Sequence, residues 1–485
     1  MAHVVMFTFP AQGNASPILN LAELLALAGL HVTFINTENF HCRLLRHSPE
    51  HFARLSTLPR LRFRTVPDGL PKDHPRPILE FLNLERSLRT SSRDAYREIL
   101  LNKDGNGWPP VTCVIADANL RLAYEFPEEM GFPVFFFRTT SAASFWAYHC
   151  IPDLLKAGEI PLSVDSDMDE MVENVRGMEK ILRRRDLPSF CQRARTADDP
   201  FLLFAVGTAD DTRSRAVLFN TFECLEAAAL SLIRSVHQTT YAVGPLHSLL
   251  QGIGGTAGDT LSGLWEQDRS SVAWLDEQPH RSVVYVSFGS VAVVSEEQLA
   301  EFRVGLVDSG YRVLWVLRSD LMGSEKQGAP VWAGELEATG KMKVVGWAPQ
   351  REVLGHPAVG CFLTHSGWNS TLESFAAGVP MVCWPFFADQ QINSRFVEEV
   401  WGSGVDMKDV CSSEAVTRMM RTAMEGERAE RMRLAAERLA DEARRSVGEG
   451  GSSRMEFLRL VEDIKGMAAK FSDDGRRCKQ DIKQL

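Results

Sequence analysis

Short apolar runs alternate with longer amphipathic stretches in the first half of the chain. Residues 4–9 form an apolar run of strand length, and residues 17–28 then repeat leucine and isoleucine at helical spacing until Gly29. Ser16 and Pro17 form an N-cap and first-turn pair, which predicts where this helix begins. Further strands are predicted at residues 31–36, 112–116 and 134–137. Strands that alternate with helices in this way are typical of an α/β domain with a parallel sheet.

The alternation lapses between residues 247 and 263, a polar and glycine-rich stretch that we interpret as a linker. Beyond it, strands are predicted at residues 283–288, 312–317, 343–345 and 359–363, and a helix at residues 295–308. We therefore expect two doubly wound α/β domains, over residues 1–246 and 264–470, followed by a tail or surface helix over residues 471–485. Ligands of such sheets bind beyond the carboxyl ends of the strands, so we expect the site in a cleft between the domains.

Composition agrees with a folded two-domain protein and excludes several classes of function. The 485 residues exceed the usual size of a single core, and 45% hydrophobic and 24% charged residues are ordinary for a globular chain. A net charge of −10 provides no basic surface for nucleic acid or an anionic membrane. No signal peptide or membrane-spanning run is predicted, and the nine cysteines lack metal-site spacing. We expect a cytoplasmic protein with no nucleic-acid or membrane partner.

Residues suited to a nucleotide occur together between residues 347 and 373. The ring of Trp347 can stack on a base, and the Gln350 amide can pair with the edge of a base or ribose. Residues 364–371 follow a predicted strand and open a helix, whose first amides and positive dipole end favour an anion such as a diphosphate. Glu373, one helical turn further on, can accept hydrogen bonds from ribose hydroxyls. These residue types suit a uridine diphosphate sugar.

Two polar residues after the aromatic turn at residues 384–387 suit the sugar itself. Asp389 and Gln390 can hydrogen-bond the hydroxyls of a hexose. The whole segment over residues 347–390 resembles the donor-binding signature of the plant family 1 UDP-glycosyltransferases, in its residues and in its length. Other stretches resemble landmarks of the same family: FPAQG at residues 9–13, RDLPS at 185–189, NTFE at 220–223, WLD at 274–276, YVSFGS at 285–290 and LWV at 314–316.

The resemblance implies the GT-B fold, in which two Rossmann-like domains face a central cleft. It also implies a hexosyltransferase that uses no metal or other cofactor and inverts the configuration at the sugar C1. The terminal Gln390 of the motif is associated with glucose, so UDP-glucose is the expected donor. We expect a small hydrophobic plant metabolite, a terpenoid or a phenolic, as the acceptor, and a monomeric enzyme.

The resemblance implies a binding role for each residue whose position matches the family motif. The resemblance implies that the uridine is held by Trp347, Ala348, Gln350 and Glu373, the diphosphate by Ser290, His365, Asn369 and Ser370, and the sugar by Trp368, Asp389 and Gln390. Thr140 and Ser141 match the loop of the first domain that reaches the donor. Phe145 and His149 lie in a stretch that lines the acceptor pocket in similar enzymes. Further apolar lining, or simply core, is expected from Phe7, Phe9, Phe135, Phe136, Phe137 and Trp146.

The loop after the first strand departs from the family pattern. It usually reads PAQGH, and its histidine takes the proton of the acceptor hydroxyl while an aspartate steadies the ring. Here residues 10–14 read PAQGN, and Asp117 matches the aspartate. An amide cannot take a proton at neutral pH, whereas general-base catalysis accelerates a reaction by about 10²–10⁴. Asn14 and Asp117 are therefore the expected catalytic residues, with the base itself missing.

Three accounts of Asn14 are open. In the first, the acceptor arrives already ionised, as a carboxylate or an acidic enol or phenol, and Asn14 only positions it. In the second, another group acts as the base, either Asp117 directly or His149. In the third, the protein binds the UDP-sugar with little or no transfer, or uses the fold for another reaction on a hydrophobic ligand.

One acidic cluster matches the spacing by which metal-dependent transferases hold a divalent cation. Asp165, Asp167 and Asp169 alternate with other residues, as in a DxD motif. No strand is predicted before them, so we interpret this stretch as a solvated acidic loop. The basic run at residues 183–185 is likewise interpreted as surface charge near a turn.

Overall fold

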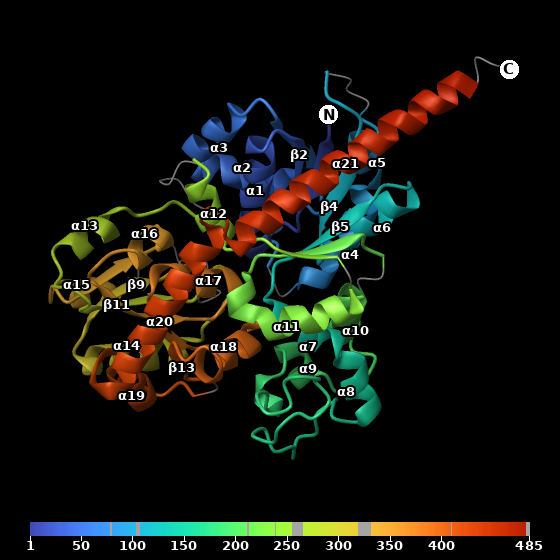
Figure 1. The fold of residues 1–485 in the computed structure, drawn as a ribbon. Coiled ribbons are helices and arrows are strands. Elements are labelled where there is room, and N and C mark those ends of the chain that lie inside the picture. Colours follow the sequence, from blue (N-terminus) through green and yellow to red (C-terminus); the bar gives the residue numbers. More distant parts are fainter. Residues whose placement is uncertain are drawn as a thin grey trace.

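The computed structural model describes residues 1–77, 80–102, 107–210, 213–237, 239–254, 265–318, 331–408 and 410–481. Two parallel sheets organise the chain, one in each half, which confirms the doubly wound architecture expected from the sequence (Figure 1). The first has the strand order β3-β2-β1-β4-β5-β6-β7 and the second the order β10-β9-β8-β11-β12-β13. In both sheets the chain reverses its direction of winding beside the first strand, and such a switch point is where ligands bind.

The strands of the first sheet are β1 (His3–Phe7), β2 (His31–Thr37), β3 (Leu61–Val66), β4 (Cys113–Asp117), β5 (Val134–Arg138), β6 (Ala216–Phe219) and β7 (Thr240–Ala242). Those of the second sheet are β8 (Val283–Ser287), β9 (Arg312–Val316), β10 (Met342–Val345), β11 (Val359–Thr364), β12 (Met381–Cys383) and β13 (Gly404–Asp406). Strands β1, β4 and β5, and β8 and β11, are buried along their whole length, as the apolar runs predicted.

Helices of the first half are α1 (Gln12–Leu27), α2 (Glu38–His47), α3 (Pro49–Ser56), α4 (Phe81–Ser91), α5 (Arg93–Leu100), α6 (Arg121–Glu129), α7 (Ala142–His149), α8 (Ile151–Ala157), α9 (Ser189–Arg193), α10 (Pro200–Ala209), α11 (Glu223–Val236) and α12 (Leu246–Gly252), with the 3₁₀ turn η2 (Arg184–Asp186). Later helices are α13 (Ser270–Asp276), α14 (Glu296–Ser309), α15 (Val331–Glu337), α16 (Gln350–Leu354), α17 (Trp368–Ala377), α18 (Gln390–Glu399), α19 (Ser413–Met424), α20 (Gly426–Val447) and α21 (Ser452–Asp481).

Helix starts differ in how well local signals predict them. Ser295 caps α14 in a reciprocal capping box with Gln298, so this helix begins where the sequence indicated. Helix α1 begins at Gln12, before the predicted start, and its N-cap position is Ala11 rather than Ser16. Pro17 therefore lies inside α1, where its missing N–H leaves the carbonyl four residues earlier without a helical partner.

The predicted linker begins too early. Residues 247–252 belong to α12, and Leu249 and Leu250 are buried in the core that α1 shares with the first sheet. Both leucines are apolar positions of a short helix. This helix was not recognised in the sequence because a glycine-rich stretch follows it directly. The predicted stretch at residues 255–263 lies outside the described residues.

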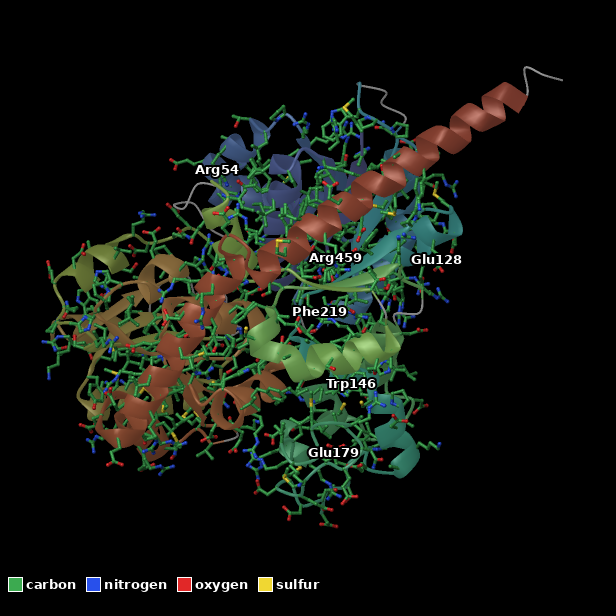
Figure 2. The ribbon with its side chains drawn as sticks, viewed as in Figure 1. Arg54, Glu128, Trp146, Glu179, Phe219 and Arg459 are labelled. Atoms are coloured by element: carbon green, nitrogen blue, oxygen red, sulfur yellow. The ribbon has the colours of Figure 1, made fainter. Side chains whose placement is uncertain are left out.

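The C-terminal helix returns to the first sheet. Figure 1 shows α21 running from the second half across the molecule towards the N-terminal half. Phe457, Leu460 and Ile464 are buried in the core of the first sheet. Arg459 lies with its guanidinium 4.2 Å from the ring centroid of Tyr241 in β7 (Figure 2). The assignment of all of residues 264–470 to the second domain therefore does not hold for α21, which continues to Asp481 through much of the predicted tail.

Within the part of the chain that the structure describes, no helix combines the length and the apolar character needed to cross a membrane.

Candidate functional site

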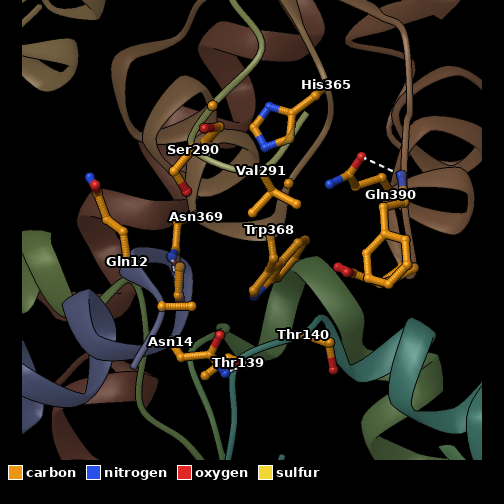
Figure 3. A pocket seen from close by; sticks show the side chains of 18 of the residues that line it. Gln12, Asn14, Thr139, Thr140, Ser290, Val291, His365, Trp368, Asn369 and Gln390 are labelled. Carbon is orange, nitrogen blue, oxygen red and sulfur yellow. Dashed lines mark hydrogen bonds between the residues drawn. The ribbon is translucent and has the colours of Figure 1, made fainter. Parts of the chain in front are cut away.

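The carboxyl ends of both sheets face one cavity. The first turn of α1, which follows β1, contributes Asn14 to its lining, and the loop after β4 contributes Asn119. The loops that follow β5, β8 and β11 contribute Thr139, Ser290 and His365 (Figure 3). The carboxyl ends of the strands in the two sheets thus face each other across the cavity. This is the position that the doubly wound pattern predicts for a ligand.

Most of the donor-binding residues predicted from the sequence line this cavity. They are Thr140, Ser290, Trp347, Ala348, Gln350, His365, Trp368, Asn369, Ser370, Glu373, Asp389 and Gln390. Apart from Thr140 and Ser290, they come from one continuous segment, which leaves β10, forms β11 and α17 and ends at the start of α18. The structure therefore gathers this segment into one wall of the cavity.

The expected uridine end is built around Trp347 and Glu373. One face of the Trp347 ring is covered by Trp265, with 4.8 Å between the ring centroids, so a base can stack only on the other face. The Gln350 amide nitrogen donates to Glu373 Oε2 at 2.7 Å and to Ser370 Oγ at 3.0 Å. Both amide hydrogens of Gln350 are therefore used inside the protein. Gln350 thus holds the Glu373 carboxylate in place, and the contact with the nucleotide expected from the sequence stays a prediction.

A cation that sequence reasoning missed lies beside this carboxylate. Arg351 lines the same cavity, directly after Gln350 in the chain. Burial raises the pKa of Glu373, and the charge of Arg351 and the hydrogen bond from Gln350 oppose that rise. Its position within the signature segment was the only signal that could have identified Arg351.

The expected diphosphate end centres on His365. Its ring lies against two glycines, since a Cβ atom at Gly289 or Gly367 would be within 2.3 or 2.4 Å of it. Burial, and then the nearby charge of Arg318, lower the pKa of His365 to about 4. The imidazole is therefore neutral at physiological pH, with one N–H to donate, and its Nδ1 has no hydrogen-bond partner among the residues that the structure describes. Helix α17 begins three residues later, and its first amides add further donors for an anion.

A proline in the first domain helps to join the two domains at this point. Because Pro17 has no N–H, the carbonyl of Gly13 lacks its partner within α1. It accepts a hydrogen bond of 2.8 Å from Asn369 Nδ2, in the first turn of α17. Trp368 makes a second contact of this kind, from its indole N–H to the Asn220 carbonyl at 2.9 Å. The N-terminus of α17 is thus held against the first turn of α1, which carries Asn14.

The expected sugar end has one amide and one carboxylate. Gln390 Oε1 accepts from the backbone N–H groups of Phe386 and Phe387, both at 2.8 Å, which leaves its amide hydrogens for a ligand (Figure 3). Asp389 accepts from Asn393 Nδ2 at 2.8 Å. Burial raises the pKa of Asp389 to about 6, so its carboxyl group titrates just below neutral pH.

This raised pKa gives a pH test of the sugar end. The ionised Asp389 accepts hydrogen bonds from sugar hydroxyls more strongly than the neutral form, so affinity for UDP-glucose should fall as the pH drops through about 6. We expect UDP-glucose to bind about tenfold more weakly at pH 5 than at pH 7.5, the effect of losing one hydrogen bond to a charged group, with a much smaller change for UDP. Calorimetric titrations of both ligands measure this difference. Parallel losses for UDP and UDP-glucose would mean that Asp389 does not contact the sugar, and Asp389→Asn should remove the difference.

Asn14 and Asp117 form a hydrogen-bonded pair at the opposite side of the cavity. Asn14 Nδ2 lies 3.0 Å from Asp117 Oδ2, which also accepts from the backbone N–H of Phe9 at 2.9 Å. The carboxylate is fully buried and does not line the cavity, whereas Asn14 does. Burial raises the pKa of Asp117, although its hydrogen bonds from Asn119, Phe9, Asn14 and Thr8 oppose that rise.

Besides Asp117, three predicted site residues do not line the cavity. Ser141 caps α7 by accepting from the Ser144 N–H and donates to Asn393 Oδ1 at 2.9 Å. Phe145 packs in the core, 5.4 Å from Phe219 between ring centroids. His149 stacks on Trp146, with 5.1 Å between the centroids. Packing of α7 thus turns both candidate acceptor residues away from the cavity and leaves His149 out of reach as a base. The other candidate aromatics are buried core residues: Phe7, Phe9, Phe135, Phe136, Phe137 and Trp146. Trp146 is labelled in Figure 2.

A different set of aromatic residues forms the apolar end of the cavity. These are Phe81, Tyr148, Phe190, Phe201, Phe204 and Phe387. Helix α10 turns one face towards this end, with Phe201, Phe204, Ala205 and Thr208 at helical spacing. That spacing was the signal available in the sequence for this part of the lining.

The acidic loop agrees with its interpretation as a solvated cluster, but the basic run beside it does not. The Asp169 carboxylate is 59% exposed and pairs with Arg183 and Arg185 at 3.2 and 2.8 Å. Arg183 also binds the fully buried Asp186, from its Nε at 2.8 Å. Arg183 is therefore part of a buried ion network and not only surface charge.

Comparisons with known proteins agree with this site. The sequence profile described as UDP-glucoronosyl and UDP-glucosyl transferase matches residues 208–438. The chain is 47% identical over 467 residues to the myricetin 3-O-rhamnoside 1,2-glucosyltransferase of Crocosmia x crocosmiiflora, covering 96% of each chain. It is 46% identical over 476 residues to the 7-deoxyloganetic acid glucosyltransferase of Catharanthus roseus, covering 96% of this chain and 98% of that one. Its fold matches the crystal structure of Os79 from O. sativa in complex with UDP, with a TM-score of 0.79 and 29% identity over 95% of this chain and 100% of that one.

Proposed function

The chain belongs to the plant family 1 UDP-glycosyltransferases, with their GT-B fold and glycosyl-transfer activity, and on that premise we propose that it moves glucose from UDP-glucose to an oxygen atom of a small hydrophobic plant metabolite. In this proposal the transfer inverts the configuration at C1 and uses no metal ion. The cytoplasm is the proposed compartment, and a monomer the proposed state.

One observation carries the proposal. A single cavity has the signature residues of the donor on one wall and aromatic side chains at its other end, and Asn14 also lines it. A hydrophobic acceptor suits the aromatic end, and a hexose bound near Asp389 and Gln390 would be within the same space. The relatives support this class of acceptor, since their names give a flavonol rhamnoside, myricetin 3-O-rhamnoside, and 7-deoxyloganetic acid.

The reaction is a direct displacement. A lone pair of the acceptor oxygen forms the new bond to C1 while the bond from C1 to the phosphate oxygen breaks, and that electron pair leaves with UDP. The first amides of α17 and the neutral His365 N–H would stabilise the charge that develops on the diphosphate, and the two walls would hold the reacting atoms in line. Asn14 cannot take the acceptor proton, so the proton is released to water once the new bond has formed.

Turnover in the presence of EDTA tests the function. We expect the full-length protein, given UDP-glucose and a panel of phenols, terpenoid alcohols and carboxylic acids, to form glucosides that mass spectrometry detects, at the same rate with EDTA as with MgCl₂.

Glu373→Ala should weaken UDP-glucose binding by about 1–3 kcal/mol, because the ribose hydroxyls would lose their hydrogen-bond acceptor. Glu352→Ala is the matched control, because that carboxylate pairs with Arg269 on the surface of α16.

Two results would reject parts of the proposal. If transfer stops in EDTA and returns with Mg²⁺, the metal-free mechanism is wrong. If the protein binds UDP-glucose but glucosylates no member of the panel, transfer to a small hydrophobic acceptor is wrong.

A further inference from the structure

The residue before Asp389 and Gln390, at the expected sugar end, has an unusual backbone conformation. Ala388 has a φ of 55°, which lies in the left-handed region. There the Cβ atom of an L-residue comes too close to the following carbonyl oxygen, and alanine has no polar side chain to offset the cost. Such a conformation persists only where the surrounding structure holds it. Ala388 also lines the cavity, so the contacts that hold it affect the sugar end directly.

Ser189, from the first half of the chain, makes these contacts. The Ala388 N–H donates to Ser189 Oγ at 2.9 Å, and the Ala388 carbonyl accepts from the Ser189 N–H at 3.4 Å. Ser189 is only 3% exposed, so water competes little for either bond. Asp389, in contrast, is bound by Asn393 of its own half of the chain. The backbone of Ala388 is thus fixed from across the interface between the two sheets.

The segment that carries Ser189 is itself anchored on the second half of the chain. Asp186, three residues earlier, is fully buried and contacts the Lys408 ammonium beyond β13. Lys408 Nζ also donates to the Gln391 carbonyl at 3.1 Å, in the first turn of α18. Ser189 is therefore held at a fixed position relative to α18, whose N-cap residue is Asp389.

The same segment reaches the aromatic end of the cavity. Phe190 lines that end and packs edge-on against the ring of Tyr148, with 5.2 Å between the centroids. Ser189, directly before it in the chain, does not line the cavity. Ser189 therefore connects a side chain of the aromatic end with the backbone of Ala388 at the sugar end.

We propose, resting on the function above, that Ser189 is a positioning residue for the transferred sugar. By holding Ala388 in its left-handed conformation, it directs the Asp389 carboxylate at the hydroxyls of the glucose unit. Without the Ser189 oxygen, the Ala388 N–H loses its acceptor, and Ala388 relaxes to a negative φ. That change turns Asp389 away from the sugar and leaves the uridine end, around Trp347, as it is.

Binding of UDP and UDP-glucose to Ser189→Ala tests the proposal. In calorimetric titrations at pH 7.5, we expect the full-length variant to bind UDP-glucose about fivefold to tenfold more weakly than the native protein, the effect of about one hydrogen bond, and to bind UDP equally well. The weakening of UDP-glucose binding at pH 5, expected from Asp389, should shrink to less than about threefold, because the carboxylate no longer contacts the sugar. Ser189→Thr, which keeps the hydroxyl, should retain the native values.

A second substitution separates the backbone conformation of Ala388 from a general loss of stability. Glycine adopts a positive φ without strain, so Ser189→Ala combined with Ala388→Gly should regain UDP-glucose affinity to within about threefold of the native protein. Ser412→Ala is the matched control. Ser412 Oγ also accepts from a backbone N–H, that of Ala415, but it caps α19 and does not line the cavity, so both affinities should be unchanged.

The outcomes that would overturn this role of Ser189 are specific. They are an equal loss for UDP and UDP-glucose in Ser189→Ala, no loss for either, or no recovery in the double variant. Should Ser189→Ala not fold, Ser189→Cys takes its place, because a thiol is only a weak hydrogen-bond acceptor. If the native protein shows the same pH effect for UDP as for UDP-glucose, Asp389 does not contact the sugar. The proposed sugar site then fails, and this inference fails with it.

Discussion

Replacing Asn14 with histidine is expected to accelerate glucosyl transfer to neutral alcohols by about 100-fold, within the range of about 10²–10⁴ that a general base contributes. The hydrogen bond from Asn14 Nδ2 to Asp117 Oδ2 defines where an imidazole N–H would be held. With Nδ1 donating to that carboxylate, the Nε2 atom would face the cavity in place of the amide oxygen and could take the acceptor proton. Initial rates on cinnamyl alcohol, at saturating UDP-glucose, measure the gain.

The pH dependence of the rate shows whether the new histidine acts as a base or only changes the local structure. The ratio of the histidine variant's kcat to that of the native protein should fall as the pH drops through about 6.5, where imidazole becomes protonated. The titration of Asp389, whose pKa is about 6, affects both proteins and leaves this ratio unchanged. Asn14→Ala is the matched variant, since it opens the same position without supplying a base, and it should not accelerate transfer. A ratio that does not change with pH, or a histidine variant no faster than Asn14→Ala, would contradict the account of Asn14 as the position of the missing base.

Lys408→Ala is expected to lower the free energy of unfolding by about 3–5 kcal/mol, the usual cost of removing one partner from a buried ion pair. The Lys408 ammonium is almost fully buried beyond β13, where it contacts Asp186 and lies 3.0 Å from Asp406 Oδ2. Arg183 binds Asp186 from the other side. Without Lys408, the cation nearest to the Asp406 carboxylate among the described residues would be Arg183, 3.8 Å away. Urea denaturation measures the change.

The pKa of Asp186 sets the pH range of this stabilisation. Burial favours the neutral acid, but the hydrogen bonds from Arg183 and Lys408 outweigh it, and the pKa of Asp186 is lowered. A carboxyl group whose pKa is lower in the folded state stabilises the fold above its ordinary pKa near 4, and this contribution disappears as the pH falls through the folded value. Arg438→Ala is the matched control, because its pair with Glu442 is exposed and should contribute less than about 0.5 kcal/mol. Equal, small effects of both substitutions would contradict the account of the buried network.

Local patterns were sufficient for most of the sheet positions. The buried runs of β1, β4, β5, β8 and β9 lie within one or two residues of their predicted limits, because a fully buried parallel strand has a continuous apolar sequence. The helix predicted over residues 295–308 likewise agrees with α14 to within one residue at each end. The return of α21 to the first sheet has no local signal, because it depends on contacts between residues more than 200 positions apart, such as Tyr241 and Asp463.

The donor wall could be predicted because its residues are nearly contiguous in the sequence. The acceptor side could not, because α7 is apolar around most of its circumference, and its periodicity does not indicate which face meets the cavity. The packing of α7 in the folded protein therefore determines that Phe145 and His149 point away from the cavity. The contact between Asn119 and Thr139 follows from the register of β4 and β5, which pairs Asp117 with Phe137 and so places the residues two positions further on beside each other. That register is a property of the folded sheet and is not visible in either segment alone.

The configuration of the product tests the central claim most directly, namely that an acceptor on the Asn14 side displaces UDP held on the α17 side. The sugar of UDP-glucose is α-linked, so displacement from the opposite face must give a β-glucoside. We expect the anomeric proton signal in the NMR spectrum of the purified cinnamyl glucoside, formed in EDTA, to show the β-anomer alone. An α-glucoside, or release of free glucose and UDP with no glucoside, would contradict direct displacement across this cavity.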